Sequence, residues 1–463
     1  MKVPGLYRIM RRLIRLLLGF YFRRIERFHA ERIPKSGPVL FTSNHPNSLA
    51  DSFVIGATVS RKVNFVATVQ LFRFKPLKWL LTSCGVIPIN RVKDDPRAMR
   101  SVADTFAACY QVFERGEAIG IFPEGITHDD PQLKTVKTGA ARMGLDLEHR
   151  HQGRLGLQIV PVGLNLSAKE KYRSEILVNF GEPIRVADFL KDYPERKREC
   201  IHELKERIEQ SLKQLILHIP QLEHVRVVAA VKRLYLEELL VASEPVAAPV
   251  AKRAEELRLT QMIAQAVEYV YRTQPERAAA FVRKLDDYEM ELGRLKLSEE
   301  SLASRPQKRK VARLSLLWAM LGIFGAPIAI YGWMHRLLPY LVVRWAVRRF
   351  ANRDKHKAQI ATTAIIAGLV SFSFFYGLYI LLVQWFFGWP ESLWFALSLP
   401  VTGIVAHYYI RKLRRLGAGI WDTLVLLRAP AAARRLAALR AEMIAEIEAV
   451  RPEILDQLKP LES

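Results

Sequence analysis

The sequence is poor in cysteine, which limits the kinds of site that it can build. Its 463 residues include three cysteines, Cys84, Cys109 and Cys200. They are odd in number and lack the paired spacing of structural zinc sites. This pattern indicates a reducing compartment and predicts no metal site.

Three common catalytic and nucleotide-binding motifs are also missing. The sequence contains no G-x-S-x-G nucleophile elbow, no P-loop and no dinucleotide-binding fingerprint. A serine hydrolase that acts on lipids would need such an elbow around its nucleophile. The absence of both nucleotide motifs predicts that no nucleotide cofactor is bound, apart from any that forms part of a substrate.

Acidic residues are scarce relative to basic ones. The 46 Asp and Glu against 70 Lys and Arg give a formal net charge of +24, which suits nucleic acid or an anionic membrane. Leu314–Met334 and Ile360–Gly388 are apolar and free of charge, and Ser392–Ile410 follows after a short break. Each stretch is long enough for the roughly 30 Å hydrocarbon core of a bilayer. We therefore predict an integral membrane protein with lipid, and not nucleic acid, as its partner.

The positions of the basic residues predict how these stretches cross. Lys and Arg cluster before the first stretch, between the first and second, and after the third, but are missing between Gly388 and Glu391. By the positive-inside rule that turn lies outside and the three basic segments are cytoplasmic. Three full crossings cannot satisfy this, so residues 314–334 are predicted to form a hairpin that bends near Pro327. A tilted ordinary span is the alternative.

Residues 1–30 are predicted to form a basic amphipathic helix that lies in the membrane interface. Apolar residues recur at helical spacing while arginines occupy other positions. The arginines interrupt the apolar run too often for a signal peptide. The alternative is a solvated basic face over a soluble core.

The middle of the sequence is typical of an α/β domain, which we place at residues 31–220. Short β-rich runs alternate there with helical segments such as Arg97–Arg115. The predicted strands are Val39–Thr42, Phe65–Val69, Gly85–Ile89, Ala118–Phe122, Leu157–Val162 and Ile176–Phe180. Residues 221–310 are predicted to be an amphipathic helical linker region, 311–410 the membrane region with spans at 360–388 and 392–410, and 411–463 a helical tail.

The loop after the first of these strands carries a histidine and an aspartate in the sequence S-N-H-P-N-S-L-A-D, Ser43–Asp51. Ser48 and Asp51 fit a capping box at the start of a helix. Pro46 disfavours a helical conformation at His45, so a bend there allows His45 to contact Asp51 from outside the helix. The two interpretations are compatible, and the sequence does not decide between them.

Three further strand ends carry chemically useful residues. They are the segments Ile87–Arg91, Phe122–Thr127 and Ile159–Asn165. Ligands of such sheets bind at the carboxyl ends of strands, so these segments are expected to share one edge.

The order of these four segments resembles the motif blocks of the glycerophosphate acyltransferase family, which includes lysophosphatidic acid and glycerol-3-phosphate acyltransferases. The resemblance covers about residues 30–220. In this sequence five residues lie between His45 and Asp51, whereas the usual family spacing is four. The longer spacing resembles a branch that includes fungal glycerol-3-phosphate and dihydroxyacetone-phosphate acyltransferases.

The resemblance implies an α/β acyltransferase domain, followed by amphipathic helices and a C-terminal helical membrane region. It implies transfer of an acyl group from acyl-CoA or acyl carrier protein to glycerol-3-phosphate or dihydroxyacetone phosphate in phospholipid biosynthesis. The alternative acceptor is 1-acylglycerol-3-phosphate. Alternatives of another class are a lipid hydrolase and a non-catalytic membrane scaffold. The catalytic domain is expected on the cytoplasmic side, with no cofactor beyond the thioester co-substrate.

The expected site has a catalytic pair and a set of residues that bind substrate. His45 is expected to take the proton of the attacking hydroxyl, and Asp51 to orient the imidazole and stabilise its protonated form. Arg91 is expected to bind the acceptor's phosphate through its planar guanidinium. The expected substrate-binding residues are Asn90, Arg91, Glu124, Gly125, Thr127, Lys137 and Pro161.

Overall fold

The chain forms two compact units. The computed structural model describes residues 5–89, 99–128, 130–168, 172–193, 195–242, 249–297, 299, 308–350 and 359–458. The first unit comprises Met1–Glu223, Ser243–Gln261 and Val347–Ile365. The second comprises His224–Ala242, Met262–Ala346 and Ile366–Ser463.

The first unit is built on a mixed sheet that has eight strands among the described residues. The strands are β1 (Arg24–Phe28), β2 (Val39–Ser43), β3 (Val63–Thr68), β4 (Ile87–Ile89), β5 (Ala118–Ile121), β6 (Gln158–Leu166), β7 (Glu175–Phe180) and β8 (Ile184–Arg185). Their order is β1-β7-β6-β2-β5-β3-β4, and β8 pairs with β6. The pairs along β6-β2-β5-β3-β4 are parallel, as is β1 with β7, whereas β7 and β8 run antiparallel to β6. The carboxyl ends of β2 and β5 therefore meet at one edge of the sheet.

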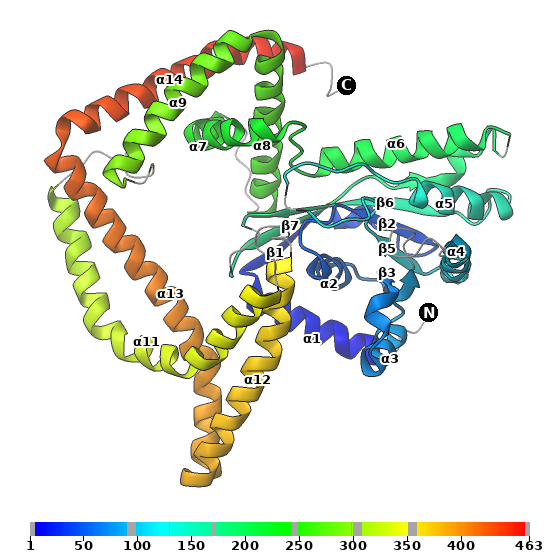
Figure 1. Ribbon diagram of the computed structural model, residues 1–463, viewed down its shortest axis with the longest axis horizontal. Coiled ribbons are helices and arrows are strands. Elements are labelled where there is room, and N and C mark those ends of the chain that lie inside the picture. The colour runs from blue at the N-terminus through cyan, green and yellow to red at the C-terminus, as the bar shows by residue number, and fades with distance from the viewer. Residues whose placement is uncertain are drawn as a thin grey trace. The chain divides into compact units, whose positions relative to one another are not determined.

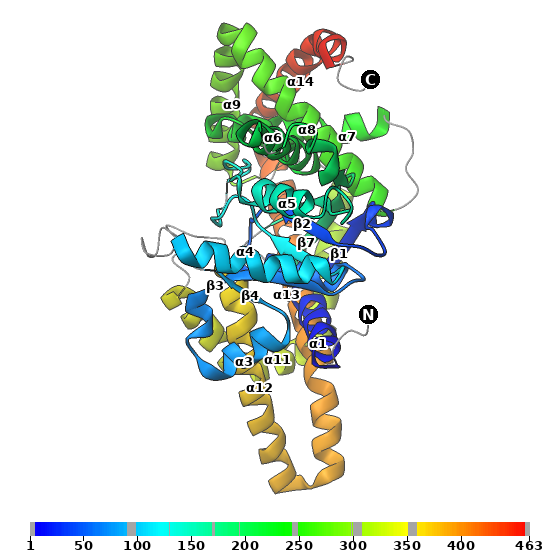
Figure 2. The same cartoon turned by 90° about the vertical axis from the view of Figure 1, so that its right-hand side faces the viewer.

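Helices cover both faces of this sheet, with α5 and α6 on one side and α1 on the other (Figures 1 and 2). The helices of this unit include α1 (Gly5–Tyr21), α2 (Leu49–Thr58), α3 (Lys75–Ser83), α4 (Met99–Glu114), α5 (Gly139–Arg150) and α6 (Lys197–Leu215). Leu40 of β2 lies in one buried cluster with residues of α4, α5 and α6. Phe41, the next residue, lies in the other cluster with residues of α1 and α2. This alternation is that of a strand buried on both faces, and the predicted α/β fold is confirmed.

The amino-terminal segment departs from the sequence prediction. The helix expected over residues 1–30 ends at Tyr21 in the structure, and Arg24–Phe28 form β1. Strand β1 was not predicted because its residues, R-I-E-R-F, are mostly charged. Its Glu26 is nevertheless buried, and an ion pair of 3.0 Å with Arg253 compensates its charge.

Helix α1 exposes the apolar residues that were expected to face the membrane. Ile9 is 62% exposed and Leu16 is 73% exposed, whereas Leu18 and Tyr21 are buried against the unit. The outward apolar stripe is the orientation that an interfacial helix requires. Its position in a membrane remains a prediction.

The second unit is helical throughout its described residues. It contains α7 (Val225–Ala242), α9 (Pro275–Leu295), α13 (Trp389–Arg428) and α14 (Pro430–Leu458), together with most of α11 (Lys308–Phe350) and α12 (Gln359–Phe387). Helix α8 (Pro249–Thr273) is divided between the two units after Gln261. Helices α9 and α14 pack along each other, and Figure 2 shows α12 and α13 joined by a tight turn. That turn is at Gly388, whose φ of 98° suits glycine.

Three helices in the described part of the chain are long and apolar enough to cross a membrane. They are Ala312–Phe350, Thr362–Phe387 and Trp389–Arg428. The bend expected near Pro327 does not divide the first of them, since α11 continues through Pro327 and Pro339. Its ribbon is nevertheless strongly curved (Figure 1). Whether α11 forms a hairpin or a full crossing remains a prediction, because length and composition alone fit both.

Candidate active site

The junction of β2 and α2 carries the S-N-H-P-N-S-L-A-D segment. Ser48 is the N-cap residue of α2, but its side chain makes no cap hydrogen bond. Its backbone has φ 56° and ψ −137°, which is unusual for a residue other than glycine. Ser48 is therefore the N-cap residue and Asp51 lies in the first turn, as predicted, but the predicted side-chain cap of Ser48 is wrong.

His45 and Asp51 form a close pair at this junction. His45 Nδ1 lies 2.9 Å from Asp51 Oδ2, and the same oxygen accepts a 2.7 Å hydrogen bond from the backbone N–H of Asn47. The Asp51 side chain is 3% exposed and the His45 side chain 15% exposed. A neutral imidazole that donates its Nδ1 proton to Asp51 has its lone pair on Nε2. Nε2 has no hydrogen-bond partner within the described residues.

An aromatic ring fixes the plane of the imidazole. The ring of Phe122 stacks on that of His45 with centroids 3.8 Å apart and an angle of 11° between the planes. Phe122 directly follows β5, the strand that pairs in parallel with β2. The carboxyl ends of the two strands therefore bring the first and third motif segments together.

Glu124 is buried beneath this pair. Its side chain is 0% exposed, and Oε1 accepts a 3.1 Å hydrogen bond from the backbone N–H of His45. Oε2 accepts from the backbone N–H of Lys134 at 2.8 Å and lies 2.5 Å from His128 Nε2. Glu124 thus holds the backbone of His45 and of the third motif segment. Its expected part in binding the substrate remains a prediction.

His128 was missed in the sequence. It shares the Glu124 carboxylate with the backbone of His45, and its Nδ1 is buried without a partner in the described part of the chain. A signal was available, since His128 follows Glu124 at a spacing of four residues. The sequence prediction stopped at Thr127, the end of the motif segment.

The other residues expected to bind substrate are placed unevenly. Gly125 has φ 69°, and Lys137 Nζ lies 2.5 Å from the position that a Cβ atom would take at this glycine. Thr127 is half-buried after the same turn. Pro161 was expected at a strand end but lies inside β6, where it pairs with Thr42. The Asn44 side chain, at the end of β2, donates to the Leu164 carbonyl and accepts from the Leu164 N–H.

The second motif segment is described only in part. Its strand is β4, which pairs in parallel with β3 and so ends at the same edge as β2 and β5. Asn90 and Arg91 lie outside the described residues. Their contact with a phosphate remains a prediction.

Thiol and metal chemistry find little support in the described residues. Burial raises the pKa of the Cys109 thiol to about 12 and also raises the pKa of Cys84 and Cys200. Such thiols are poor nucleophiles at neutral pH. Within the described ranges, no group of three or more His, Cys, Asp or Glu side chains could hold a metal ion.

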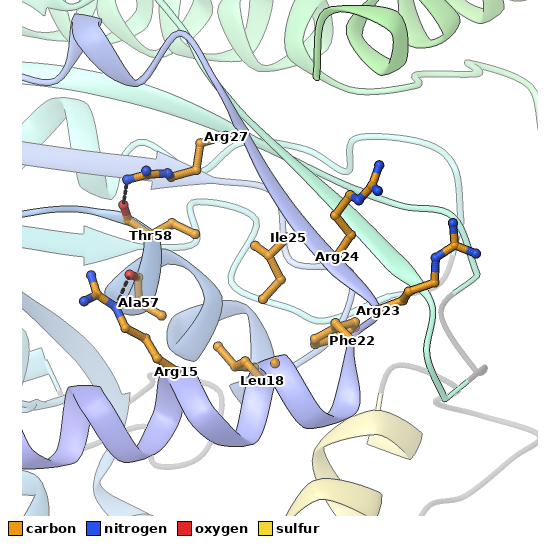
Figure 3. A pocket seen from close by; sticks show the side chains of 10 residues that line it. Arg15, Leu18, Phe22, Arg23, Arg24, Ile25, Arg27, Ala57 and Thr58 are labelled. Carbon is orange, nitrogen blue, oxygen red and sulfur yellow. Dashed lines mark hydrogen bonds between the residues drawn. The ribbon is translucent and has the colours of Figure 1, made fainter. Parts of the chain in front are cut away.

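A pocket of about 420 Å³ lies at the other end of α2 (Figure 3). Its lining comes from α1, β1 and the end of α2, and it includes Arg15 and Arg27. Both guanidinium groups bond backbone carbonyls of α2, Arg15 to Ala57 at 2.9 Å and Arg27 to Thr58 at 3.1 Å. The pocket is thus separated from His45 by the length of α2.

Residues 8–165 match the protein-family model described as Acyltransferase. The matched range includes all four strand-end segments, Ser43–Asp51, Ile87–Arg91, Phe122–Thr127 and Ile159–Asn165.

Curated relatives carry related names. The chain is 22% identical over 309 residues to Uncharacterized acyltransferase C1718.04 of Schizosaccharomyces pombe, which covers 48% of this chain and 46% of that protein. It is 33% identical over 141 residues to Glycerol-3-phosphate O-acyltransferase 1 of Saccharomyces cerevisiae, 29% of this chain and 18% of that protein. It is 29% identical over 156 residues to 1-acyl-sn-glycerol-3-phosphate acyltransferase of Borreliella burgdorferi, 34% of this chain and 57% of that protein. The chain therefore spans less than two thirds of each of these relatives.

Proposed function

We propose that this protein transfers a fatty acyl group from an acyl thioester to a hydroxyl of a glycerol phosphate-type acceptor, as a step of phospholipid synthesis. The observation that carries this proposal is the imidazole of His45, held at Nδ1 by Asp51 and stacked on Phe122. It lies within the segment that matches acyltransferases. The donor is acyl-CoA or an acylated carrier protein.

The chemistry needs one base that later serves as an acid. His45 Nε2 takes the proton of the acceptor hydroxyl while the oxygen attacks the thioester carbonyl carbon. Asp51 stabilises the imidazolium that forms. When the carbon–sulfur bond breaks, the imidazolium returns the proton to the thiolate that leaves. Atoms and charge balance without a covalent acyl-enzyme or a metal.

Glycerol-3-phosphate or dihydroxyacetone phosphate is the favoured acceptor. The five-residue spacing between His45 and Asp51 supports this choice, as does the name of the Saccharomyces cerevisiae relative. Arg91 is proposed to bind the acceptor's phosphate, because a guanidinium gives two parallel hydrogen bonds to phosphate oxygens. Lys137, which lies against Gly125, is proposed as a second cation near the phosphate.

A second candidate is acylation of 1-acylglycerol-3-phosphate. The relative from Borreliella burgdorferi bears that name, and the match extends over 57% of its length. Both acceptors share the glycerol phosphate and differ in which hydroxyl is free. The base chemistry at His45 serves either one.

An acceptor panel tests the proposal. The full chain, purified in detergent, is incubated with a labelled acyl thioester and with glycerol-3-phosphate, dihydroxyacetone phosphate or 1-acylglycerol-3-phosphate, and the products are identified by mass. We expect acylated glycerol-3-phosphate or acylated dihydroxyacetone phosphate. Phosphatidate alone would select the second candidate. Free fatty acid with every acceptor would support a hydrolase and contradict acyl transfer.

The membrane region is proposed to place the catalytic unit on the cytoplasmic side. The turn at Gly388 lacks Lys and Arg, whereas α11 begins with Lys308-Arg-Lys and α13 carries Arg411-Lys-Leu-Arg-Arg415. In a variant without the three native cysteines, one cysteine replaces Glu391 and, as the control, one replaces the partly exposed His151. We expect an impermeant maleimide to label intact cells at position 391 only. Labelling at position 151 alone would show the opposite topology, with the catalytic unit outside the cytoplasm.

A further inference from the structure

The amino end of α2 lacks the cap that its own sequence offers. The first N–H groups of any helix have no partner inside the helix, and a Ser or Thr at the N-cap usually bonds one of them. The Ser48 side chain makes no such bond. This end of α2 carries Asp51, so whatever holds it also determines where the carboxylate lies.

A threonine from far along the chain takes the place of the cap. Thr362 Oγ1 accepts a 3.3 Å hydrogen bond from the backbone N–H of Ala50, in the first turn of α2. The same hydroxyl donates to the backbone carbonyl of Asn47 at 3.2 Å. Residues Val347–Ile365 belong to the same compact unit as α2. One hydroxyl therefore bonds both the helix and the segment that enters it.

The surroundings of Thr362 fix it in this position. Ile365, one turn further along α12, is buried in the same hydrophobic cluster as Ala50 and Val54 of α2. Ala364 packs against that cluster. Since residues three apart lie on the same side of a helix, Thr362 and Ile365 face α2 together.

The contact leads directly to the catalytic pair. The Asn47 carbonyl accepts from Thr362, and the Asn47 N–H donates to the Asp51 oxygen that bonds His45. The path from Thr362 to the imidazole thus consists of three hydrogen bonds through one residue and one carboxylate. Movement of Asn47 would shift the carboxylate relative to the imidazole.

We propose that Thr362 is a positioning residue for acyl transfer, and that α12 thereby holds the His45–Asp51 pair. The proposal rests on the proposed function. Thr362 is also the first residue of the stretch 362–387, which is long and apolar enough to cross a membrane. The helix that anchors the protein in the membrane then also fixes the geometry of the catalytic pair. The pair is held at the end of that helix, which is the membrane interface to which lipid substrate and product partition.

Neighbouring threonines provide a matched test. Thr363 is the next residue of α12 and makes no hydrogen bond to α2 among the described contacts. Thr362→Val removes the hydroxyl and keeps the shape, Thr362→Ser keeps the hydroxyl, and Thr363→Val is the control. All are made in the full chain and assayed for kcat and for both KM values with the acceptor that the wild type uses.

The expected result separates positioning from a structural role. Thr362→Val should lower kcat by about five- to thirtyfold, the factor that corresponds to a lost helix cap, with both KM values within about twofold. Thr362→Ser and Thr363→Val should keep kcat within about twofold of the wild type. An unchanged kcat in Thr362→Val would overturn the proposal. So would an equal loss in Thr362→Ser, or a rise in KM without a fall in kcat.

Hydrogen exchange keeps the test independent of the assay. Mass spectrometry of peptides that cover Asn47–Val54 measures protection of the α2 amides without substrate. Faster exchange in Thr362→Val than in Thr363→Val is expected, and equal exchange would show that the cap does not exist. If the wild type transfers no acyl group but exchange changes as expected, the proposed function fails while the contact stands.

Discussion

The two ends of α2 are held in different ways. At the amino end, one hydroxyl from Thr362 bonds the helix and the segment before it. At the carboxyl end, three guanidinium groups from α1 and β1 bond four successive carbonyls. These bonds join Arg15 to Ala57, Arg27 to Thr58, and Arg11 to Val59 and Ser60. Figure 3 shows the Arg15 and Arg27 contacts.

The difference follows from what each end must do. The last carbonyls of a helix attract cations, and here three arginines bond neighbouring carbonyls, so the loss of one leaves the others in place. At the amino end, the Asp51 carboxylate bonds both His45 and the backbone N–H of Asn47, so it serves the catalytic pair and the segment before the helix. The end that carries the chemistry therefore depends on single contacts, whereas the other end is held redundantly. Substitutions that remove one of these contacts should lower activity at the amino end and have little effect on it at the carboxyl end.

Asp51 gives the largest expected effect among the residues that hold the histidine. Asp51→Asn keeps the size of the side chain but removes the charge that stabilises the imidazolium, so kcat should fall by roughly 10²-fold or more. Asp51→Ser can still serve the first turn of the helix but not the imidazolium, and it should lose as much. Steady-state kcat with the preferred acceptor measures both. Near wild-type turnover in Asp51→Ser would mean that Asp51 serves only the helix.

Glu124 should give the next largest effect. Glu124→Gln keeps one oxygen for the backbone N–H of His45, but the amide NH2 group at the other position cannot accept the hydrogen bond from the backbone N–H of Lys134. Loss of a buried charge-assisted hydrogen bond predicts a fall in kcat of about 10- to 100-fold. The pattern of kcat and acceptor KM checks the role. A rise confined to the acceptor KM would show that Glu124 acts in binding the acceptor and does not hold His45.

The carboxyl end of α2 should tolerate a single change. Arg15→Gln leaves Arg11 and Arg27 on the neighbouring carbonyls, so kcat should stay within about twofold and stability should fall by less than about 1 kcal/mol. Turnover and the thermal unfolding midpoint in one detergent measure the two quantities. A fall in kcat as large as that of Thr362→Val would remove the contrast between the ends.

Ser48 should give the smallest effect on activity. Its positive φ costs an L-residue roughly 1–3 kcal/mol, and glycine adopts it without strain. Ser48→Gly should therefore keep kcat and keep or raise the unfolding midpoint. Ser48→Ala, which cannot relieve the strain, is the matched control for loss of the hydroxyl. A fall in kcat in both variants would restore Ser48 as the functional cap.

Local patterns in the sequence predicted much of the site. The strand before His45, the helix after it and the bend at Pro46 predicted that His45 could meet Asp51, and the structure places them 2.9 Å apart. Parallel strands then bring Phe122 and Glu124 to the same edge. These features depend on periodicity and strand ends, which are properties of short segments.

The features that the sequence did not predict depend on distant residues. Ser48 matched a capping pattern, but the competing bonds of Asp51 and the contact with Thr362, 312 positions from Ala50, decide the geometry. Strand β1 has a charged sequence, and its buried Glu26 pairs with Arg253, which is distant in the sequence, as well as with Arg24. The predicted strand Leu157–Val162 contained Pro161 but ended too early, since β6 continues to Leu166 through its antiparallel pairing with β7. A pattern within a short segment does not indicate contacts with residues that are distant in the sequence.

Acyl transfer by wild type and by His45→Ala, measured side by side, tests the central claim most directly. Labelled acyl thioester and glycerol-3-phosphate are supplied to each purified protein, with His151→Ala, a change at a partly exposed histidine outside the candidate site, as the control, and product is identified by mass. We predict acylated glycerol-3-phosphate from the wild type and the control, and a rate lower by at least about 10²- to 10⁴-fold from His45→Ala with binding of the donor retained. An undiminished rate in His45→Ala would contradict the assignment of His45 as the base.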